Sequence, residues 1–112
     1  MYKHDEIMQF VNMVAEVTEP NKIILFGSYA YGNPDDRSDL DLLVIKNGKD
    51  FSVDDEAELA TAVFLEKMQR NVQVRYDVFF QTEPQAQTIA ENGGAFFDAL
   101  HKGKVVYERT YQ

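Results

Sequence analysis

The sequence predicts an α/β domain in which a small mixed β-sheet has helices packed on one face and carboxylates on the other. Three observations predict it. Apolar residues recur at helical spacing in residues 5–18, a short apolar run at 23–26 stops at a glycine, and apolar and polar residues alternate at 72–80. Because helical and strand-like stretches alternate along the chain, a sheet covered by helices accounts for the pattern.

The composition limits the classes of protein to which the chain can belong. Its 112 residues, 45% of them hydrophobic, fit a single small domain over residues 1–112. Cysteine is absent, which excludes disulfides and thiolate metal ligands. No apolar run approaches the ~18–20 residues of a membrane span, and the first residues are unlike a signal peptide, so we expect a cytoplasmic protein without membrane contact. The net charge of −8 argues against extended nucleic-acid binding, which needs a basic surface.

The first elements are a helix and a strand. Residues 5–18 predict an amphipathic helix, stopped at Pro20, whose core-facing residues are Ile7, Phe10, Val11, Val14 and Val17. Residues 23–26 predict a buried strand. Residues 29–31 predict a short helix closed by Gly32, and the turn-forming residues 33–38 predict a loop.

Gly27 and Ser28 stand where the first strand turns into the short helix. A helix start offers free backbone N–H groups and the positive end of the helix dipole, which together form an anion site. Gly27 would allow a phosphate to approach the backbone, and Ser28 could cap the turn or donate its hydroxyl to a phosphate oxygen. A plain helix cap is the alternative interpretation.

Asp39 and Asp41 occupy alternate positions at the start of the next apolar run. On a strand they would share a face, roughly 6–7 Å apart, with Leu40 and Leu42 on the other face. Adjacent carboxylates repel unless a cation lies between them, and Mg²⁺ suits such oxygen ligands. The alternative is a strand with a solvated outer face. Combined with the phosphate turn, the pair predicts a nucleoside-triphosphate site with its metals.

A third carboxylate, Asp77, falls on the polar face of the predicted strand 72–80, where an aspartate is unfavourable without a function. If this strand lies beside that of Asp39 and Asp41, three carboxylates meet. Between these strands, residues 46–50 predict a turn, and Ser52 to Asp55 predict a capping box that opens a helix running to about Arg70. The apolar face of that helix is expected to hold Leu59, Ala60, Val63, Phe64 and Met68.

The remaining elements are short. Pro84 is expected to begin a helix that ends near Gly93, residues 95–101 a second helix, and residues 105–107 an edge strand or a packed tail. His4 and His101 lie far apart and are not expected to be catalytic.

Gly27-Ser28, ten further residues, then Asp39-x-Asp41 and the later Asp77 resemble the motif of DNA polymerase beta-type nucleotidyltransferases. The short chain is most similar to their minimal nucleotidyltransferase (MNT) branch, which includes the MntA antitoxins. The resemblance spans about Ile23 to Phe80 and implies a polymerase beta-like nucleotidyltransferase fold.

One departure from the family concerns the cation that meets the triphosphate besides the metals. Many relatives carry an arginine near Tyr29 or Tyr31, where this chain has tyrosines. Arg37 and Arg75 are the candidates to replace it.

The resemblance implies specific roles for the candidate residues. Gly27 and Ser28 would bind the β- and γ-phosphates of ATP. Asp39, Asp41 and Asp77 would be the catalytic and Mg²⁺-binding carboxylates, and Asp77 could also help to deprotonate the acceptor hydroxyl. It further implies an antitoxin that transfers AMP to a tyrosine of a HEPN-type toxin partner.

Two other functions remain open from the sequence: a non-catalytic binding module that neutralises a partner protein, and a small-molecule (antibiotic) nucleotidyltransferase. A domain of this length is expected to have little chain left to enclose a small molecule. Some of its eight phenylalanines and six tyrosines could form an interaction surface or simply fill the core; the candidates are Phe96, Phe97, Tyr107 and Tyr111.

Overall fold

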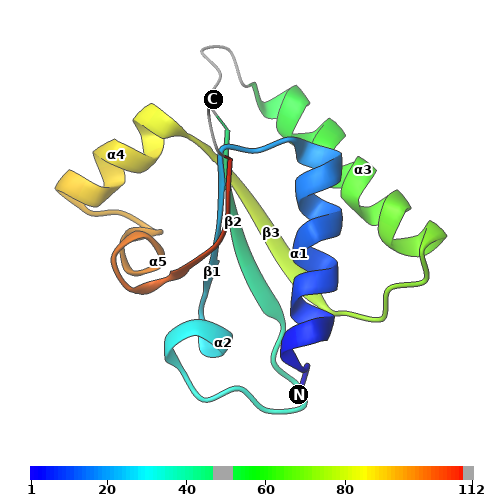
Figure 1. Cartoon of the computed structure of the whole chain (residues 1–112). Helices are drawn as coiled ribbons and strands as arrows, with labels where there is room; N and C mark the ends of the chain where they lie inside the picture. The colour runs from blue at the N-terminus through cyan, green and yellow to red at the C-terminus, as the bar shows by residue number, and fades with distance from the viewer. Residues whose placement is uncertain (47–51, 110–112) are drawn as a thin grey trace.

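The computed structural model describes residues 1–46 and 52–109. Along these residues the elements are α1 (His4–Thr18), β1 (Lys22–Phe26), α2 (Ser28–Tyr31), β2 (Leu40–Lys46), α3 (Val53–Gln69), β3 (Tyr76–Thr82), α4 (Glu83–Asn92), α5 (Phe97–Lys102) and β4 (Lys104–Glu108). Figure 1 shows the sheet between two layers of helices, with α1 and α3 on one side, α4 and α5 on the other, and α2 at one end.

The strands form one four-stranded sheet in the order β3-β2-β1-β4. β1 pairs antiparallel with β2 and with β4, whereas β2 and β3 run parallel. The sheet is therefore mixed, as predicted, and residues 105–107 belong to the edge strand β4. A parallel pair requires a crossover connection, and α3 lies in it.

The main core lies between the sheet and the layer formed by α1 and α3. Its helical residues include Phe10, Val14 and Val63, which pack on Leu42 and Val44 of β2. The predicted helix at 5–18 is confirmed, and its apolar positions 10, 11 and 14 are fully buried. This layer explains why alternate residues of each central strand are apolar.

The opposite face of the sheet is also partly covered, which corrects the expectation that helices would occupy one face only. Ile24, Leu43 and Ile45 pack against Ala86 of α4 and Ala99 of α5. Central strands with apolar residues at consecutive positions, such as Leu42 to Ile45, are typical of a sheet buried on both faces. The carboxylates share this second face with the two C-terminal helices.

Helix α3 begins where the sequence predicts, with Ser52 and Asp55 forming the capping box. Its predicted apolar face is wrong in part. Val63 is buried and Leu59 is partly buried, but Phe64 and Met68 are 52% and 62% exposed. They continue a row of exposed apolar residues along the outer surface of the helix, which we call the α3 stripe: Val53, Ala57, Ala60, Phe64 and Met68.

Other expectations differ from the structure in their boundaries. β3 begins at Tyr76 rather than at residue 72, because its partner β2 begins at Leu40, directly opposite. Val72 and Val74 are nevertheless buried, as the alternation predicted. Phe96 and Tyr107 pack against the cores, whereas Phe97 remains 38% exposed. Tyr111 and the predicted turn at 47–50 lie outside the described residues. Within the described ranges, no helix is both long and apolar enough to cross a membrane.

Candidate active site

The end of β1 is fitted closely to β2 through Gly27. Its φ of 72° lies in the region that glycine adopts freely, and a Cβ at this position would collide with the Asp41 carboxylate. Gly27, rather than Ser28, occupies the cap position of α2, and its carbonyl accepts the N–H groups of Ala30 and Tyr31. Gly27 and Ser28 therefore lie at the predicted strand-to-helix turn, beside a carboxylate.

Asp41 and Asp77 lie directly opposite each other on the parallel pair β2 and β3. Side chains of paired residues project to the same face of a sheet, so the two carboxylates face the same space. Phe26 of β1 is the partner of Asp41 on its other side. The predicted meeting of Asp77 with the Asp41 strand is thus present in the structure.

The environment of Asp41 raises the pKa of its carboxyl above the usual value. Burial is the largest cause, followed by repulsion from Asp77 and then from Asp39. Both other carboxylates therefore act on Asp41. A negatively charged group in this position is costly, and a cation placed between the carboxylates would remove the cost.

Asp39 lies one residue before β2 and faces a positive charge. Its Oδ1 atom is 3.4 Å from Nε of Arg75, which lies one residue before β3, and Arg75 also donates to the carbonyl oxygen of Asp36 at 2.6 Å. Of the two arginines predicted to replace the family cation, Arg75 is therefore the one at the carboxylates. The Arg37 backbone N–H donates to the Asp35 side chain in the preceding loop.

Tyr29 connects α2 to the arginine through a second tyrosine. The Tyr29 hydroxyl accepts the backbone N–H of Tyr2 at 3.1 Å, and the rings of the two tyrosines stack with their centroids 5.9 Å apart. The Tyr2 hydroxyl in turn accepts the backbone N–H of Arg75 at 2.8 Å. The role of Tyr2 could not be read from the sequence, because its partners are 27 and 73 residues away.

The three carboxylates differ in how well they could hold a divalent cation. Within the described ranges no three His, Asp or Glu side chains are arranged as a complete metal site, and Asp39 is paired with Arg75. Asp41 and Asp77 form a close pair of oxygen donors on one face. Mg²⁺ is commonly bound by one or two carboxylates together with substrate phosphates, so this donor pair fits such an ion.

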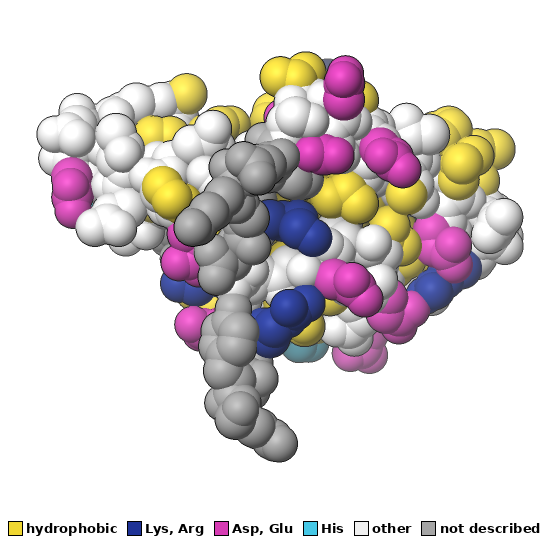
Figure 2. Space-filling model, turned by 90° about the horizontal axis from the view of Figure 1, so that it is seen from above, with side chains coloured by type: hydrophobic (Ala, Val, Ile, Leu, Met, Phe, Trp, Pro, Cys, Tyr) yellow, Lys and Arg dark blue, Asp and Glu magenta, His cyan; other side chains and the backbone are white. Residues whose placement is uncertain are grey.

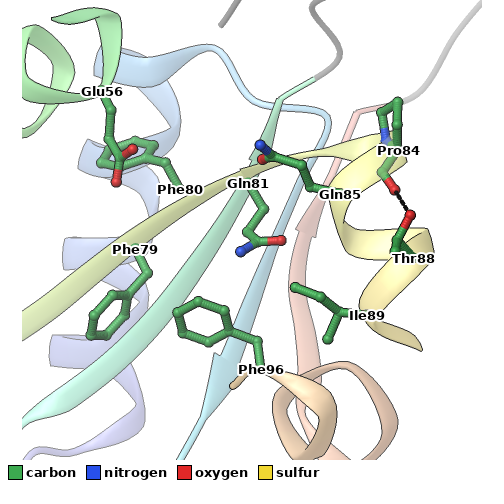
Figure 3. Close-up of a pocket in the computed structure, with 9 residues that line it drawn as sticks. All are labelled: Glu56, Phe79, Phe80, Gln81, Pro84, Gln85, Thr88, Ile89 and Phe96. Atoms are coloured by element: carbon green, nitrogen blue, oxygen red, sulfur yellow. Dashed lines mark hydrogen bonds between the residues drawn. The ribbon is translucent and has the colours of Figure 1, made fainter. Parts of the chain in front are cut away.

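A cavity of about 650 Å³ opens on the same face, further along β3. Figure 3 shows Phe79 and Gln81 of β3, Phe96, and Ile89 of α4 around it. None of the predicted site residues lines the cavity, and nothing in the sequence pointed to it. Its size lies within the roughly 300–1,000 Å³ of small-molecule sites, but it is open to solvent over much of its extent, so the expectation that so short a chain encloses no small molecule is not contradicted.

His101 makes its contacts within the two C-terminal helices. Nε2 of His101 lies 2.9 Å from the carbonyl oxygen of Ala90, and its ring packs on Phe97 with centroids 4.1 Å apart. The contact with Ala90 joins α5 to α4.

Comparison with known proteins identifies the fold. The family model described as "Polymerase beta, Nucleotidyltransferase" matches residues 8–112. A solved structure of a candidate nucleotidyltransferase from Sulfolobus solfataricus is similar over 94% of this chain and 79% of that one, with 20% identity and a TM-score of 0.60. No curated protein matches the sequence significantly. The predicted polymerase beta-like fold is confirmed, while the MNT branch stays a prediction.

Proposed function

Because the chain belongs to the polymerase beta nucleotidyltransferase family, we propose that it transfers AMP from ATP to an acceptor hydroxyl and releases pyrophosphate. The observation that carries this proposal is the register of Asp41 with Asp77, with Gly27 in contact with Asp41. It joins a carboxylate pair to a glycine turn, which are the two parts that a triphosphate site requires.

In the proposed reaction the acceptor oxygen bonds to the α-phosphorus of ATP, and the bond from that phosphorus to the bridging oxygen breaks. Asp77 would help to accept the proton of the hydroxyl. The turn at Gly27 and Ser28 would orient the β- and γ-phosphates. Mg²⁺ held by Asp41 and Asp77, joined by Asp39, would supply charge neutralisation.

The proposed acceptor is a tyrosine of a HEPN-type protein partner, which would make the chain an antitoxin. A tyrosine hydroxyl, with a pKa near 10, loses its proton more easily than a serine hydroxyl. The α3 stripe supports a protein partner, because contiguous exposed apolar residues are typical of interaction sites. Within this proposal the stripe would contact the partner while the carboxylates modify it.

The reaction is tested by measuring pyrophosphate release with ATP, Mg²⁺ and the product of the adjacent gene. Wild type should add the mass of one adenylate per modified tyrosine, and the Asp39→Asn/Asp41→Asn variant should add none. Equal turnover of both proteins would show that Asp39 and Asp41 are not required for the reaction. A partner that binds but gains no mass in either case would favour the non-catalytic binding module.

The cavity keeps a second candidate, a small-molecule nucleotidyltransferase, under consideration. The same assay with aminoglycosides in place of the protein partner separates the two. Modification of an aminoglycoside without modification of the partner would show that the protein-acceptor proposal is wrong.

A further inference from the structure

We propose that the cavity beside β3 binds the adenine base of the donor nucleotide and that Gln81 recognises its edge. This inference rests on the proposed function, in which Asp41 and Asp77 hold Mg²⁺ where the acceptor oxygen bonds to the α-phosphorus. It adds a binding site for the base of the donor nucleotide, which the carboxylates and the glycine turn would not contact.

Strand β3 leads from the carboxylates into the cavity. Asp77, Phe79 and Gln81 occupy alternate positions of this strand and therefore project to the same face, in a row that leads from the carboxylates into the cavity. Gly27 and α2 lie at the other end of the carboxylates, at the end of β1 (Figure 1). Phe26, which precedes Gly27, pairs with Asp41, and Asp41 pairs with Asp77. A nucleotide with its triphosphate at Gly27 and its α-phosphorus at Asp77 would therefore lie across the strands and reach β3 where this row begins.

An aromatic wall lies beside the carboxylates. Phe26, Phe79 and Phe96 form a cluster with ring centroids 5.2 to 6.0 Å apart, although they come from β1, β3 and the start of α5. Phe79 is 37% exposed, so part of its ring remains available to a ligand. Aromatic faces of this kind bind planar bases by stacking, at roughly 1–3 kcal/mol per base.

The Oε1 atom of Gln81 is buried and receives no hydrogen bond from any described residue. In Figure 3 its amide lies between Phe79 and Ile89, close to Phe96. A buried polar atom without a partner is unfavourable, and a glutamine amide matches the amino group and adjacent ring nitrogen of adenine. An adenine in the cavity would satisfy the amide.

The experiment compares the binding of five probes by calorimetry in Mg²⁺: ATP, GTP, CTP, UTP and inorganic tripolyphosphate. The test variant is Gln81→Met, which keeps the length of the side chain and removes the unpartnered polar atom, so its thermal stability without ligand should equal or exceed that of wild type. The matched control is Gln87→Met, because Gln87 is an exposed residue of α4 outside this cavity.

We expect wild type to bind ATP about tenfold more tightly than tripolyphosphate and than the other nucleotides. Gln81→Met should lose about tenfold in ATP affinity, with tripolyphosphate affinity unchanged, and Gln87→Met should behave as wild type.

Several results would overturn the inference. Equal affinity for ATP and tripolyphosphate would leave the triphosphate site intact but show that the cavity does not bind the base. So would unchanged ATP affinity in Gln81→Met, and tighter binding of another nucleotide would exclude adenine. If neither ATP nor tripolyphosphate binds, the proposed function itself fails.

Discussion

At the scale of single residues, the site is dominated by negative charge that is only partly balanced. Asp39 has a positive partner in Arg75. Asp41 is partly buried, and its neighbours Asp77 and Asp39 repel its charge. Because the pKa of Asp41 is raised in the folded protein, the folded state holds this proton more tightly than the unfolded chain does. Its charged form therefore reduces stability, and the loss develops as pH rises from the unfolded pKa near 3.9 through the folded pKa.

Replacing Asp41 with asparagine should therefore stabilise the protein in the absence of metal. The gain in melting temperature should be present at pH 7. It should shrink as the pH falls below about 4, because Asp41 is then increasingly protonated in the unfolded chain as well as in the folded protein. Mg²⁺ should raise the melting temperature of wild type more than that of the variant. A variant that melts below wild type at pH 7 would show that the carboxylate is not under repulsion.

A second prediction at this scale concerns Arg75. The Arg75→Met variant should bind Mg²⁺ more tightly by about two- to fivefold, because Asp39 loses a competing positive charge worth ~0.5–1 kcal/mol. Isothermal titration calorimetry measures the change, and Arg37→Met, from the neighbouring loop, is the control. Weaker Mg²⁺ binding in Arg75→Met would show instead that Arg75 holds Asp39 in the position that the metal requires.

At the scale of elements, α3 is fixed at its two ends rather than along a broad buried face. At its start, the Ser52 hydroxyl accepts the Asp55 N–H at 3.1 Å, and the Asp55 carboxylate accepts the Ser52 N–H at 3.0 Å. At its end, Arg70 bonds to Glu16 of α1 at 2.6 Å. Between these ends Val63 is the fully buried residue of the helix. The cap should therefore contribute a larger share of the stability of α3 than it would in a helix with a wide buried face.

The Ser52→Ala variant should lower the free energy of unfolding by about 1 kcal/mol, within the 0.5–2 kcal/mol range of lost helix caps. Urea unfolding followed by circular dichroism measures it. Thr61→Ala, at an exposed position of the same helix, should change stability by less than about 0.5 kcal/mol. Equal effects of the two substitutions would show that the cap does not determine the stability of α3.

Much of the fold and part of the site follow from local sequence patterns. Strand alternation predicted that Asp77 lies on the polar face, and the apolar run before Gly27 predicted the turn. The pairing of Asp39 with Arg75 and the cavity at Gln81 could not be predicted, because each joins residues from separate elements. The orientation of α3 was missed for another reason. Its apolar residues lie on two sides, and spacing alone does not say which side meets the core.

At the scale of the whole molecule, the net charge is −8. The face that Figure 2 draws shows no continuous patch of Lys and Arg side chains on its coloured part. On its coloured part, acidic side chains lie among the Lys and Arg side chains, and hydrophobic side chains are exposed between them. Such a surface repels a phosphate backbone, whereas a single nucleotide can be bound at one local site.

The protein should therefore bind duplex DNA with a dissociation constant weaker than about 10⁻⁴ M at physiological salt, the weak limit of ordinary non-specific binding. Fluorescence anisotropy of a labelled duplex measures it, with binding of ATP and Mg²⁺ by the same sample as the control. Tight binding that weakens steeply with added salt would contradict the prediction.

The parallel pairing of β2 with β3 has a consequence for the rate of folding. The other strand pairs are antiparallel, but this one forms only after the chain between Lys46 and Tyr76 has crossed back over the sheet. Contacts so distant in sequence form slowly, and this pairing also brings the Asp41 and Asp77 charges together. The charges of the two aspartates therefore oppose the formation of this strand pair. Divalent ions should accordingly accelerate refolding, and the Asp77→Asn variant should refold faster than wild type without them.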